Sequence, residues 1–449
     1  MQSCLTSIFM IGDYVMISKY SVVKQLKDGK YAVMSTISRG LIILEPEKYQ
    51  QFCLGQEEKV FAKEEMDYLV KYKYSVTDDF EETDYLLVEM SRDRFNPRIF
   101  STYIALSTLC NFSCVYCYEK GQLSGEAVMS EETLESTIKW YEGRLEKGKY
   151  SDFNICLYGG EPLLCEELLR SFVIKIKQLS LSKNVNLTFT MITNGYLLKR
   201  DICEFLIANG LKEVQITLDG CEDTHDKRRM LVNGEGTFNT IINNIISIAD
   251  TNIKIVIRTS FDESNVEEIK RLLVYLCDKG LNKRVLLYFA PIHQTETQKI
   301  SGCSFCSQHI YDDYDDIANC FCELYDASYK LGFQIPTCYT NGPCMVVGQD
   351  SCLIAPNGDL FKCVEMIGKE ELCIGNVRQD DYKGKYYSFM KADQFLNCVR
   401  SGCKYAPTCA GGCAMEAYVK NDNLNSFVCH RSIFEKLNDK LISLKCEEE

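Results

Sequence analysis

Between about residue 100 and residue 295, short apolar runs alternate with longer segments in which apolar and polar residues mix. The short runs are bounded by polar loops and predict β-strands at 103–106, 153–157, 188–192, 214–218, 253–257 and 285–289. In the longer segments apolar residues recur every three or four positions, which predicts helices at 131–144, 166–178, 201–208, 237–249 and 266–278. This alternation predicts an α/β fold, a partial (β/α)6 TIM-like barrel whose site lies at the carboxyl ends of its strands.

The predicted helix ends carry suitable capping residues. Ser130 and Asn265 stand where an N-cap is expected, because short polar side chains accept hydrogen bonds from the first turn. Gly210 and Gly280 stand where helices are expected to end. The segment 234–237 lacks the third glycine and the preceding strand of a phosphate loop, so we interpret it as a turn and cap.

Residues 1–98 follow a different pattern, which predicts a small N-terminal α+β domain. Its predicted elements are a hairpin of strands 20–26 and 31–36 around Asp28-Gly29, a strand at 41–44, helices at 46–51 and 62–71, and an acidic tail at 78–84. The domain contains no catalytic constellation. The sequence therefore leaves two roles open, a peptide-docking module or a structural cap.

Composition narrows the class of protein. A chain of 449 residues predicts two or three domains, and its net charge of -13 disfavours binding to nucleic acid, which requires a basic face. No charged n-region of a signal peptide and no apolar run of about 18 residues occurs, so we expect a cytoplasmic protein without a membrane partner. Because the cytosol keeps thiols reduced, the 25 cysteines indicate metal binding rather than disulfides.

Three of these cysteines, Cys110, Cys114 and Cys117, follow the first predicted barrel strand with the spacing C-x3-C-x2-C. Three thiolates leave a metal centre one open position, which favours a 4Fe-4S cluster that binds a small molecule. A zinc loop or reduced bystander thiols are the alternatives. The spacing resembles the signature of the radical S-adenosylmethionine (radical SAM) enzymes, in which an aromatic residue, here Tyr116, precedes the third cysteine.

A second motif, Gly159-Gly160-Glu161-Pro162, follows the second predicted strand. Two glycines allow the backbone to approach a ligand closely, and Glu161 supplies a carboxylate. Taken alone, the motif is equally an ordinary turn before a helix. It resembles a segment of the radical SAM family that holds the amino group of S-adenosylmethionine, which implies that these residues bind this cofactor.

Polar residues also end the next three predicted strands. The resemblance implies that these residues, together with Tyr116, contact the cofactor, and Arg258 is the expected partner of its carboxylate. A strand-end polar residue is otherwise a helix cap. The expected cofactor-binding residues at these ends are Thr193, Asn194, Thr217 and Arg258.

The C-terminal third carries cysteines in the order C-x13-G-x4-C, C-x4-C-x5-C-x3-C and a final C. Two zinc sites fit this spacing. The order also resembles the SPASM domain, which gives peptide-modifying radical SAM enzymes two auxiliary 4Fe-4S clusters. This resemblance implies one cluster on Cys344, Cys352, Cys363 and Cys413, and another on Cys398, Cys403, Cys409 and Cys429. The chain departs from the family at Arg400, where a cysteine is usual, so Cys398 is the less secure ligand.

Other candidate ligands receive no assignment. The pair Cys303 and Cys306 lies in a bridging region, and a lone C-x2-C pair is a weak signal. The four histidines are far apart in sequence, and for His225 we expect local hydrogen bonding. The predicted divisions are the N-terminal domain at 1–98, the radical SAM core at 99–295, the bridging region at 296–340, the SPASM domain at 341–435 and a tail at 436–449.

The resemblance also implies a reaction. An electron from the first cluster would cleave S-adenosylmethionine, and the resulting radical would remove hydrogen from a bound peptide. Our first hypothesis is thioether formation in a ribosomally made, Cys-rich precursor peptide, with flavodoxin or ferredoxin as electron donor. The alternatives are an anaerobic sulfatase-maturating enzyme that forms formylglycine, a carbon–carbon crosslinking maturase, and a zinc or iron–sulfur protein without catalytic activity.

Overall fold

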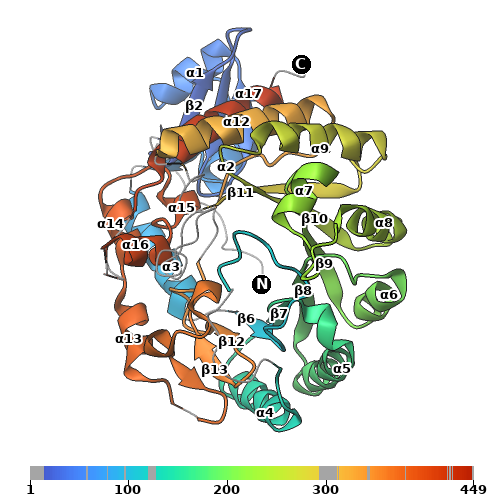
Figure 1. The fold of residues 1–449 in the computed structure, drawn as a ribbon. Coiled ribbons are helices and arrows are strands. Elements are labelled where there is room, and N and C mark those ends of the chain that lie inside the picture. Colours follow the sequence, from blue (N-terminus) through green and yellow to red (C-terminus); the bar gives the residue numbers. More distant parts are fainter. Residues whose placement is uncertain are drawn as a thin grey trace, which may run out of the picture.

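The computed structural model describes residues 15–56, 59–77, 79–95, 98–119, 128–292, 311, 313–340, 344–379, 381–421, 423, 426 and 428–446. Its centre is a nine-stranded sheet with the order β11-β10-β9-β8-β7-β6-β12-β13-β14 (Figure 1). The six barrel strands are parallel neighbours in sequence order. They are β6 (Ile99–Ala105), β7 (Asp152–Tyr158), β8 (Asn186–Thr193), β9 (Leu211–Thr217), β10 (Lys254–Phe261) and β11 (Val285–Pro291).

Helices cover the outer face of this sheet (Figure 1). The five predicted helices are confirmed, and no end is displaced by more than five residues. They are α4 (Glu131–Lys147), α5 (Glu166–Lys183), α6 (Arg200–Ala208), α8 (Phe238–Ile248) and α9 (Val266–Asp278). Ser130 caps α4 by accepting a hydrogen bond from Thr133 N at 3.1 Å. Asn265 precedes α9 but makes no cap bond; its side chain instead binds the backbone around Asp262. The mixed α/β class and the curled parallel sheet are therefore those that the sequence predicts.

The C-terminal third continues the same sheet. Strand β12 (Ser351–Ile354) pairs in parallel with β6, and β13 (Asp359–Phe361) and β14 (Gly375–Asn376) extend it by antiparallel pairing. The remaining elements are two 3-10 helices, η3 (Val364–Met366) and η4 (Glu370–Leu372), and the helices α12 (Tyr314–Lys330), α13 (Gly384–Lys391), α14 (Gln394–Arg400), α15 (Ala406–Cys409), α16 (Ala414–Asn421) and α17 (Arg431–Cys446). Helix α17 crosses the predicted boundary at residue 435, so the described part of the predicted tail is helical.

The N-terminal domain contains the predicted hairpin, strand and helices, and one helix that the sequence analysis missed. Its elements are β1 (Val15–Ile17), β2 (Ser21–Gln25), β3 (Tyr31–Ser35), β4 (Leu41–Leu44), α1 (Pro46–Cys53), α2 (Lys63–Lys71), β5 (Ser75–Thr77) and α3 (Glu82–Phe95). Helix α3 begins inside the predicted acidic tail. Its Glu82 carboxylate is buried and accepts hydrogen bonds from Ser18 and from Lys19 N, and Leu86 packs against Val399. These distant contacts, rather than a local apolar period, fix the helix.

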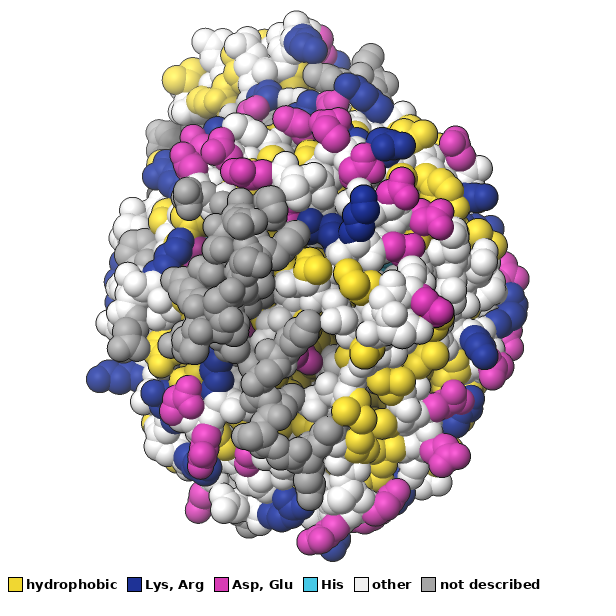
Figure 2. Space-filling view, viewed as in Figure 1, with side chains coloured by type: hydrophobic (Ala, Val, Ile, Leu, Met, Phe, Trp, Pro, Cys, Tyr) yellow, Lys and Arg dark blue, Asp and Glu magenta, His cyan; other side chains and the backbone are white. Residues whose placement is uncertain are grey.

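The surface carries charges of both signs. On the face shown in Figure 2, Asp and Glu side chains are interspersed with Lys and Arg. Within the described part of the chain, no helix combines the length and apolar content that crossing a membrane requires.

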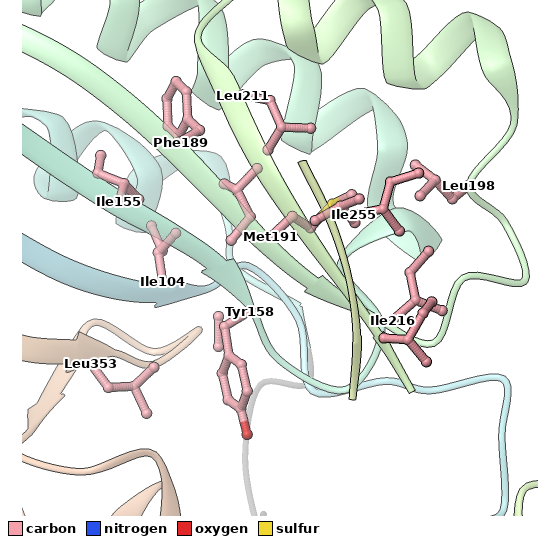
Figure 3. Packing of buried hydrophobic residues seen from close by; sticks show 14 of the residues in the cluster. Ile104, Ile155, Tyr158, Phe189, Met191, Leu198, Leu211, Ile216, Ile255 and Leu353 are labelled. Atoms are coloured by element: carbon pink, nitrogen blue, oxygen red, sulfur yellow. The ribbon is translucent and has the colours of Figure 1, made fainter. Parts of the chain in front are cut away.

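Strand register separates two faces of the barrel sheet. Register pairs Ile104 with Leu157, and both are buried on the helix side. Figure 3 shows Ile104 near Ile155, Phe189 and Met191. Residues of the opposite parity, such as Tyr103 and Cys156, face the barrel interior. The N-terminal sheet joins a separate apolar cluster, in which Val22, Ala32 and Met34 pack with Phe434 and Ile442 of α17.

This packing predicts the effect of truncating Phe434, whose side chain is fully buried. Phe434→Ala should lower the free energy of unfolding by about 3 to 5 kcal/mol, because it removes apolar contacts and leaves a cavity. Denaturant titration would measure this change. Val274→Ala, at a residue that is 46% exposed, is the matched control and should change stability by less than about 0.5 kcal/mol. Equal stability of the two variants would contradict the packing described above.

Candidate active site

A cavity of about 570 Å³ lies at the carboxyl ends of the barrel strands. One wall is the loop that follows β6, and the others come from the ends of β7 to β10 and from residues after β11 and β13. Ten of the residues predicted for the radical SAM site line it: Cys110, Cys114, Cys117, Tyr116, Gly159, Gly160, Thr193, Asn194, Thr217 and Arg258.

Backbone hydrogen bonds hold the cysteine loop in place. Ser113 N donates to Met230 O at 2.8 Å and Val115 N donates to Arg228 O at 3.0 Å. Burial raises the pKa of Cys110 to about 12 and that of Cys117 to about 11. Thiols in such a place ionise only with a compensating positive centre, which is what a bound metal cluster provides. Among the described residues, no three His, Cys, Asp or Glu side chains converge on a single metal ion.

The two glycines of the second motif lie against this loop. Gly159 has φ +124°, and a Cβ at either glycine would collide with backbone carbonyl oxygens of residues 107–109. Gly160 N and Glu161 N donate to the carbonyls of Ser107 and Leu109 at 3.2 and 2.8 Å. The motif therefore positions the cysteine loop and exposes its own backbone to the cavity.

The Glu161 carboxylate is occupied inside the protein. It is fully buried and accepts hydrogen bonds from Thr193 Oγ1 at 2.8 and 2.9 Å, Asn194 N at 2.7 Å and Leu163 N at 3.0 Å. Burial raises the pKa of Glu161, and these hydrogen bonds oppose that rise. The side chain thus joins the ends of β7 and β8, and Glu161 is absent from the described lining of the cavity, unlike the two glycines before it.

A buried charge network holds the opposite wall. The Tyr116 hydroxyl donates to Asp219 and accepts from Arg229 at 2.8 Å. Burial lowers the pKa of Arg229, but the charges of Cys114, Tyr116 and Asp219 outweigh it and raise that pKa well above its usual value. The Arg229 guanidinium therefore stays positive beside the cysteine loop.

His225 supports this network without lining the cavity. Its Nδ1 accepts from Asp219 N at 3.3 Å, and its Nε2 lies 3.1 Å from Thr237 Oγ1, which donates to Arg229 O. This pattern assigns the proton to Nε2. The predicted local hydrogen bonding of His225 is confirmed. Asp226 Oδ1 accepts from Thr237 N at 2.7 Å and from Phe238 N at 2.9 Å, so Asp226 caps α8.

The cavity suits a polar ligand. Arg229 Nε and Ser260 Oγ are buried at the cavity wall and have no hydrogen-bond partner among the described residues. Buried polar atoms in native proteins normally have partners, so these two are suited to a bound polar molecule. Three thiols on one wall and free polar atoms on another fit a 4Fe-4S cluster together with S-adenosylmethionine.

Charge interactions link three of the four thiols of the first predicted auxiliary set, although no three of them converge on a single metal ion among the described residues. Burial, followed by the charges of Glu365, Cys344 and Cys413, raises the pKa of Cys363 well above its usual value. Cys352 lies elsewhere. It pairs in register with Thr102, whose hydroxyl is bonded to Tyr141 of α4, so its side chain is on the helix face of the sheet.

The second predicted set lies in and around α14 and α15: Cys398 is within α14 and Cys409 ends α15. Burial raises the pKa of Cys398, with contributions from Cys403 and Cys429, and burial also raises the pKa of Cys409 to about 12, with contributions from Cys398 and Cys403. The structure therefore keeps Cys398 with its predicted partners. The unassigned residues Cys303, Cys306, His293 and His309 lie outside the described residues.

The sequence analysis missed part of the cavity wall. Tyr158 ends β7 facing the cavity, where its hydroxyl donates to Glu119 at 2.6 Å and is bonded to Tyr118. Burial raises the pKa of Glu119. Glu365 follows Cys363 and lines the same cavity. Alternation along β7 could have placed Tyr158, but Glu119 and Glu365 carry no periodic signal.

Comparison with known proteins places this site in a class. Residues 104–290 match the family model of the Radical SAM superfamily. Residues 104–290 therefore match a radical SAM domain, as the cysteine loop predicts.

Matches to individual proteins are more specific than the match to the family model. The chain is 24% identical over 376 residues to a cysteine-type anaerobic sulfatase-maturating enzyme of Clostridium novyi (strain NT), which spans 75% of this chain and 94% of the relative. It is 28% identical over 196 residues to the sporulation killing factor maturation protein SkfB of Bacillus subtilis (strain 168), where the match covers 43% of each.

Two solved structures share the fold. Native anSMEcpe with bound AdoMet has a TM-score of 0.59 and 18% identity, covering 78% of this chain and 100% of that one. Streptococcus suis SuiB bound to precursor peptide SuiA has a TM-score of 0.53 and 15% identity, covering 94% of this chain and 100% of SuiB.

The His225 site predicts a pH dependence of stability. Burial and the charge of Arg229 lower the pKa of His225 to about 3, whereas an unfolded histidine titrates near about 6.5. Below pH ~6.5 the unfolded chain binds a proton that the folded chain does not, so stability should fall as the pH decreases from about 6.5 toward 3. Urea titrations at several pH values should show a shallower fall for His225→Gln, with similar slopes above pH ~7. Parallel curves throughout would refute the assignment.

Proposed function

We propose that this chain is a radical SAM peptide maturase that forms thioether links in a ribosomally made, Cys-rich precursor peptide. The observation that carries the proposal is the position of Cys363. The two residues after it, Val364 and Glu365, line the same cavity as the cysteine loop. A peptide in this cavity would face the first cluster on one side and the first auxiliary thiols on the other.

The auxiliary thiols support the choice of a thioether. After burial and the charge of Glu365, the pKa of Cys363 is raised by the charges of Cys344 and Cys413 of the predicted set, and Cys352 is not among the causes. A cluster held by three thiolates leaves one iron for an outside ligand, and a thiolate of the substrate is a ligand that iron accepts. A substrate cysteine would thereby be held beside the carbon that it joins.

The reaction removes two hydrogens from the peptide for each link. When bound, S-adenosylmethionine and its cluster supply a radical that takes one hydrogen atom from a carbon of the peptide. The thiol would lose the second hydrogen as a proton as the sulfur–carbon bond forms, and one electron would leave the peptide; a cluster held by Cys344, Cys363 and Cys413 would be its acceptor. The chain's own residues bind and shield: Thr217 and Arg258 stand side by side on β9 and β10 at the cavity, suited to the polar groups of the cofactor.

The sulfatase-maturating reaction is the second candidate. The match to the Clostridium novyi relative, which spans 94% of that protein, favours it. Both reactions use the same cavity and the same flow of electrons, so the substrate peptide distinguishes them. A carbon–carbon link in the same peptide is a variant of the first candidate.

Other parts of the proposal concern partners. Strand β4 is an edge of the N-terminal sheet, and its Ile43 is 38% exposed, which suits pairing with an extended peptide segment. We therefore include peptide docking among the roles of residues 1–98. An enzyme with reduced thiols and air-sensitive clusters is suited to the cytoplasm of an anaerobic host.

Coexpression tests the proposed reaction. A Cys-rich peptide encoded beside the gene should become lighter by two hydrogens per link, measured by mass spectrometry after anaerobic expression. A Cys110→Ala variant should leave the peptide unchanged, because it removes a ligand of the first cluster. If the wild-type enzyme consumes S-adenosylmethionine but leaves this peptide unchanged and converts a Cys-x-Pro-x-Arg peptide to formylglycine, the second candidate replaces the first.

Metal analysis tests the cysteine assignments. The wild-type protein should hold about twelve irons with matching sulfide, four for each cluster. Cys363→Ala should lose about four irons, whereas Cys352→Ala, its matched control, should lose none because Cys352 lies on the helix face. Loss of iron in both variants would make Cys352 the fourth ligand. Stoichiometric zinc without sulfide would leave a metal-binding protein without this activity.

A further inference from the structure

A groove lined by positive side chains crosses the outer face of α4, away from the active site. It consists of two adjoining clefts of about 300 and 360 Å³ that share Arg144 and Lys147. We call it the basic groove and define it by its five cationic residues: Lys139, Arg144, Lys147, Lys149 and Arg378.

The charges of the basic groove are not neutralised within the described part of the chain. None of its five cations forms an ion pair there, and Arg144 instead lies over the rings of Trp140 and Tyr382. Three of the five acidic residues of α4 pair with lysines of α5, outside the groove: Glu135 with Lys175, and Glu142 and Glu146 with Lys183. The one carboxylate in the described lining, Asp350, is buried.

The floor of the groove is open. Gly143 sits in the middle of α4, where glycine costs about 1 kcal/mol relative to alanine. A Cβ at this position would meet no atom within 4 Å, so packing does not require the glycine. Its presence leaves the helix surface between Lys139 and Lys147 low and accessible.

The arrangement suits a macromolecule with several negative charges. Lys139 and Lys147 are about 12 Å apart along the helix, at ~1.5 Å per residue, and Arg378 adds a third point from outside α4. A single small anion would contact only part of such a row. The chain as a whole has a net charge of -13, so an acidic protein is repelled elsewhere and is oriented toward this groove.

The groove also lies close to the auxiliary thiols. Gln349 and Asp350 line its second cleft and lead directly into β12. Lys362 Nζ donates to Ser351 O at 2.5 Å, and Lys362 precedes Cys363 in the chain. The second cleft therefore borders the start of β12, and β13, which pairs with β12, leads to Cys363.

We propose that the basic groove docks an acidic protein that carries one electron at a time. This inference rests on the proposed function, because each cleavage of S-adenosylmethionine requires one electron from outside. The reduced carrier would lose one electron and a cluster of the enzyme would gain it; no bond forms between the proteins. A cluster on the first auxiliary set would pass this electron on to the first cluster before the peptide reacts, and would then be in its oxidised state again when the link forms.

The test compares charge reversal with a matched control. The double variant Lys139→Glu/Lys147→Glu and the single variant Gly143→Leu alter the groove, by charge and by shape. Lys212→Glu/Lys391→Glu makes the same charge change at exposed lysines elsewhere. Cleavage of S-adenosylmethionine by the holoenzyme is measured against the concentration of a reduced acidic flavodoxin, and separately with dithionite. Binding of the oxidised flavodoxin is measured at several salt concentrations.

Both groove variants should need about tenfold more flavodoxin for half-maximal cleavage and bind it correspondingly more weakly, with unchanged rates in dithionite. The control pair should behave like the wild type. The inference would be overturned if the groove variants and the control variant responded equally to flavodoxin. It would also be overturned if the groove variants lost peptide modification with dithionite as reductant, because that result would assign the groove to an acidic peptide. A wild-type enzyme that binds flavodoxin at the groove but does not cleave S-adenosylmethionine with dithionite would refute the proposed function alone.

Discussion

The buried carboxylate of Asp219 is the constraint on which the active site depends. A charge without access to water must be paired and hydrogen-bonded, or the fold loses several kcal/mol. Asp219 meets this demand with the Tyr116 hydroxyl, with Ser260 N at 3.0 Å and with Arg228, whose guanidinium also donates to Asp262 at 2.9 Å. Each partner comes from a different strand end or loop. The pairing and hydrogen bonding of this one buried carboxylate therefore hold the cysteine loop against the ends of β9 and β10.

A second buried carboxylate repeats this arrangement on the other side of the cavity. Glu161 joins β7 to β8 through Thr193 and Asn194, and Asn194 in turn donates to Asn111 in the cysteine loop at 2.8 Å. The loop is thus held between two buried carboxyl groups and the guanidinium groups of Arg228 and Arg229. Three thiolates would add negative charge here, so the balance closes only when positive charge is bound between them. The charge balance of this wall therefore fits a metal centre held by the three thiolates.

The sequence predicted the features that depend on local spacing. Apolar periodicity located the barrel strands and helices, and the cysteine spacing located the first cluster loop, because both patterns lie within a few residues. The sequence analysis failed where contacts between segments far apart in the chain determine the structure. Helix α3 is fixed by Glu82 and Leu86 against segments far along the chain. Cysteine spacing alone could not show on which face of a strand Cys352 lies, because that depends on the register of β12 with β6.

The pairing of β12 with β6 also changes how the C-terminal third should be understood. A domain joined only by a linker would leave its cysteines free to move relative to the cavity. Here β12 is hydrogen-bonded to the first barrel strand, so the loop around Cys363 keeps a constant distance from the cysteine loop. The proposed reaction between the first cluster and the auxiliary thiols would require such rigidity, because a displacement of about 1 Å already costs an enzyme much of its rate.

The second auxiliary set connects this rigid centre to the N-terminal domain. Tyr20 and Leu86 pack against Val399 and Ala406, residues that lie between the cysteines of that set, and Thr36 Oγ1 donates to Lys404 O at 2.7 Å. The second predicted set places four cysteines within residues 398–429, and clusters bound there would contribute folding energy. On this assignment, the surface against which the N-terminal domain packs would be shaped by cluster binding. If the N-terminal domain docks the peptide, it would take the position needed for docking only in an enzyme that already carries its clusters.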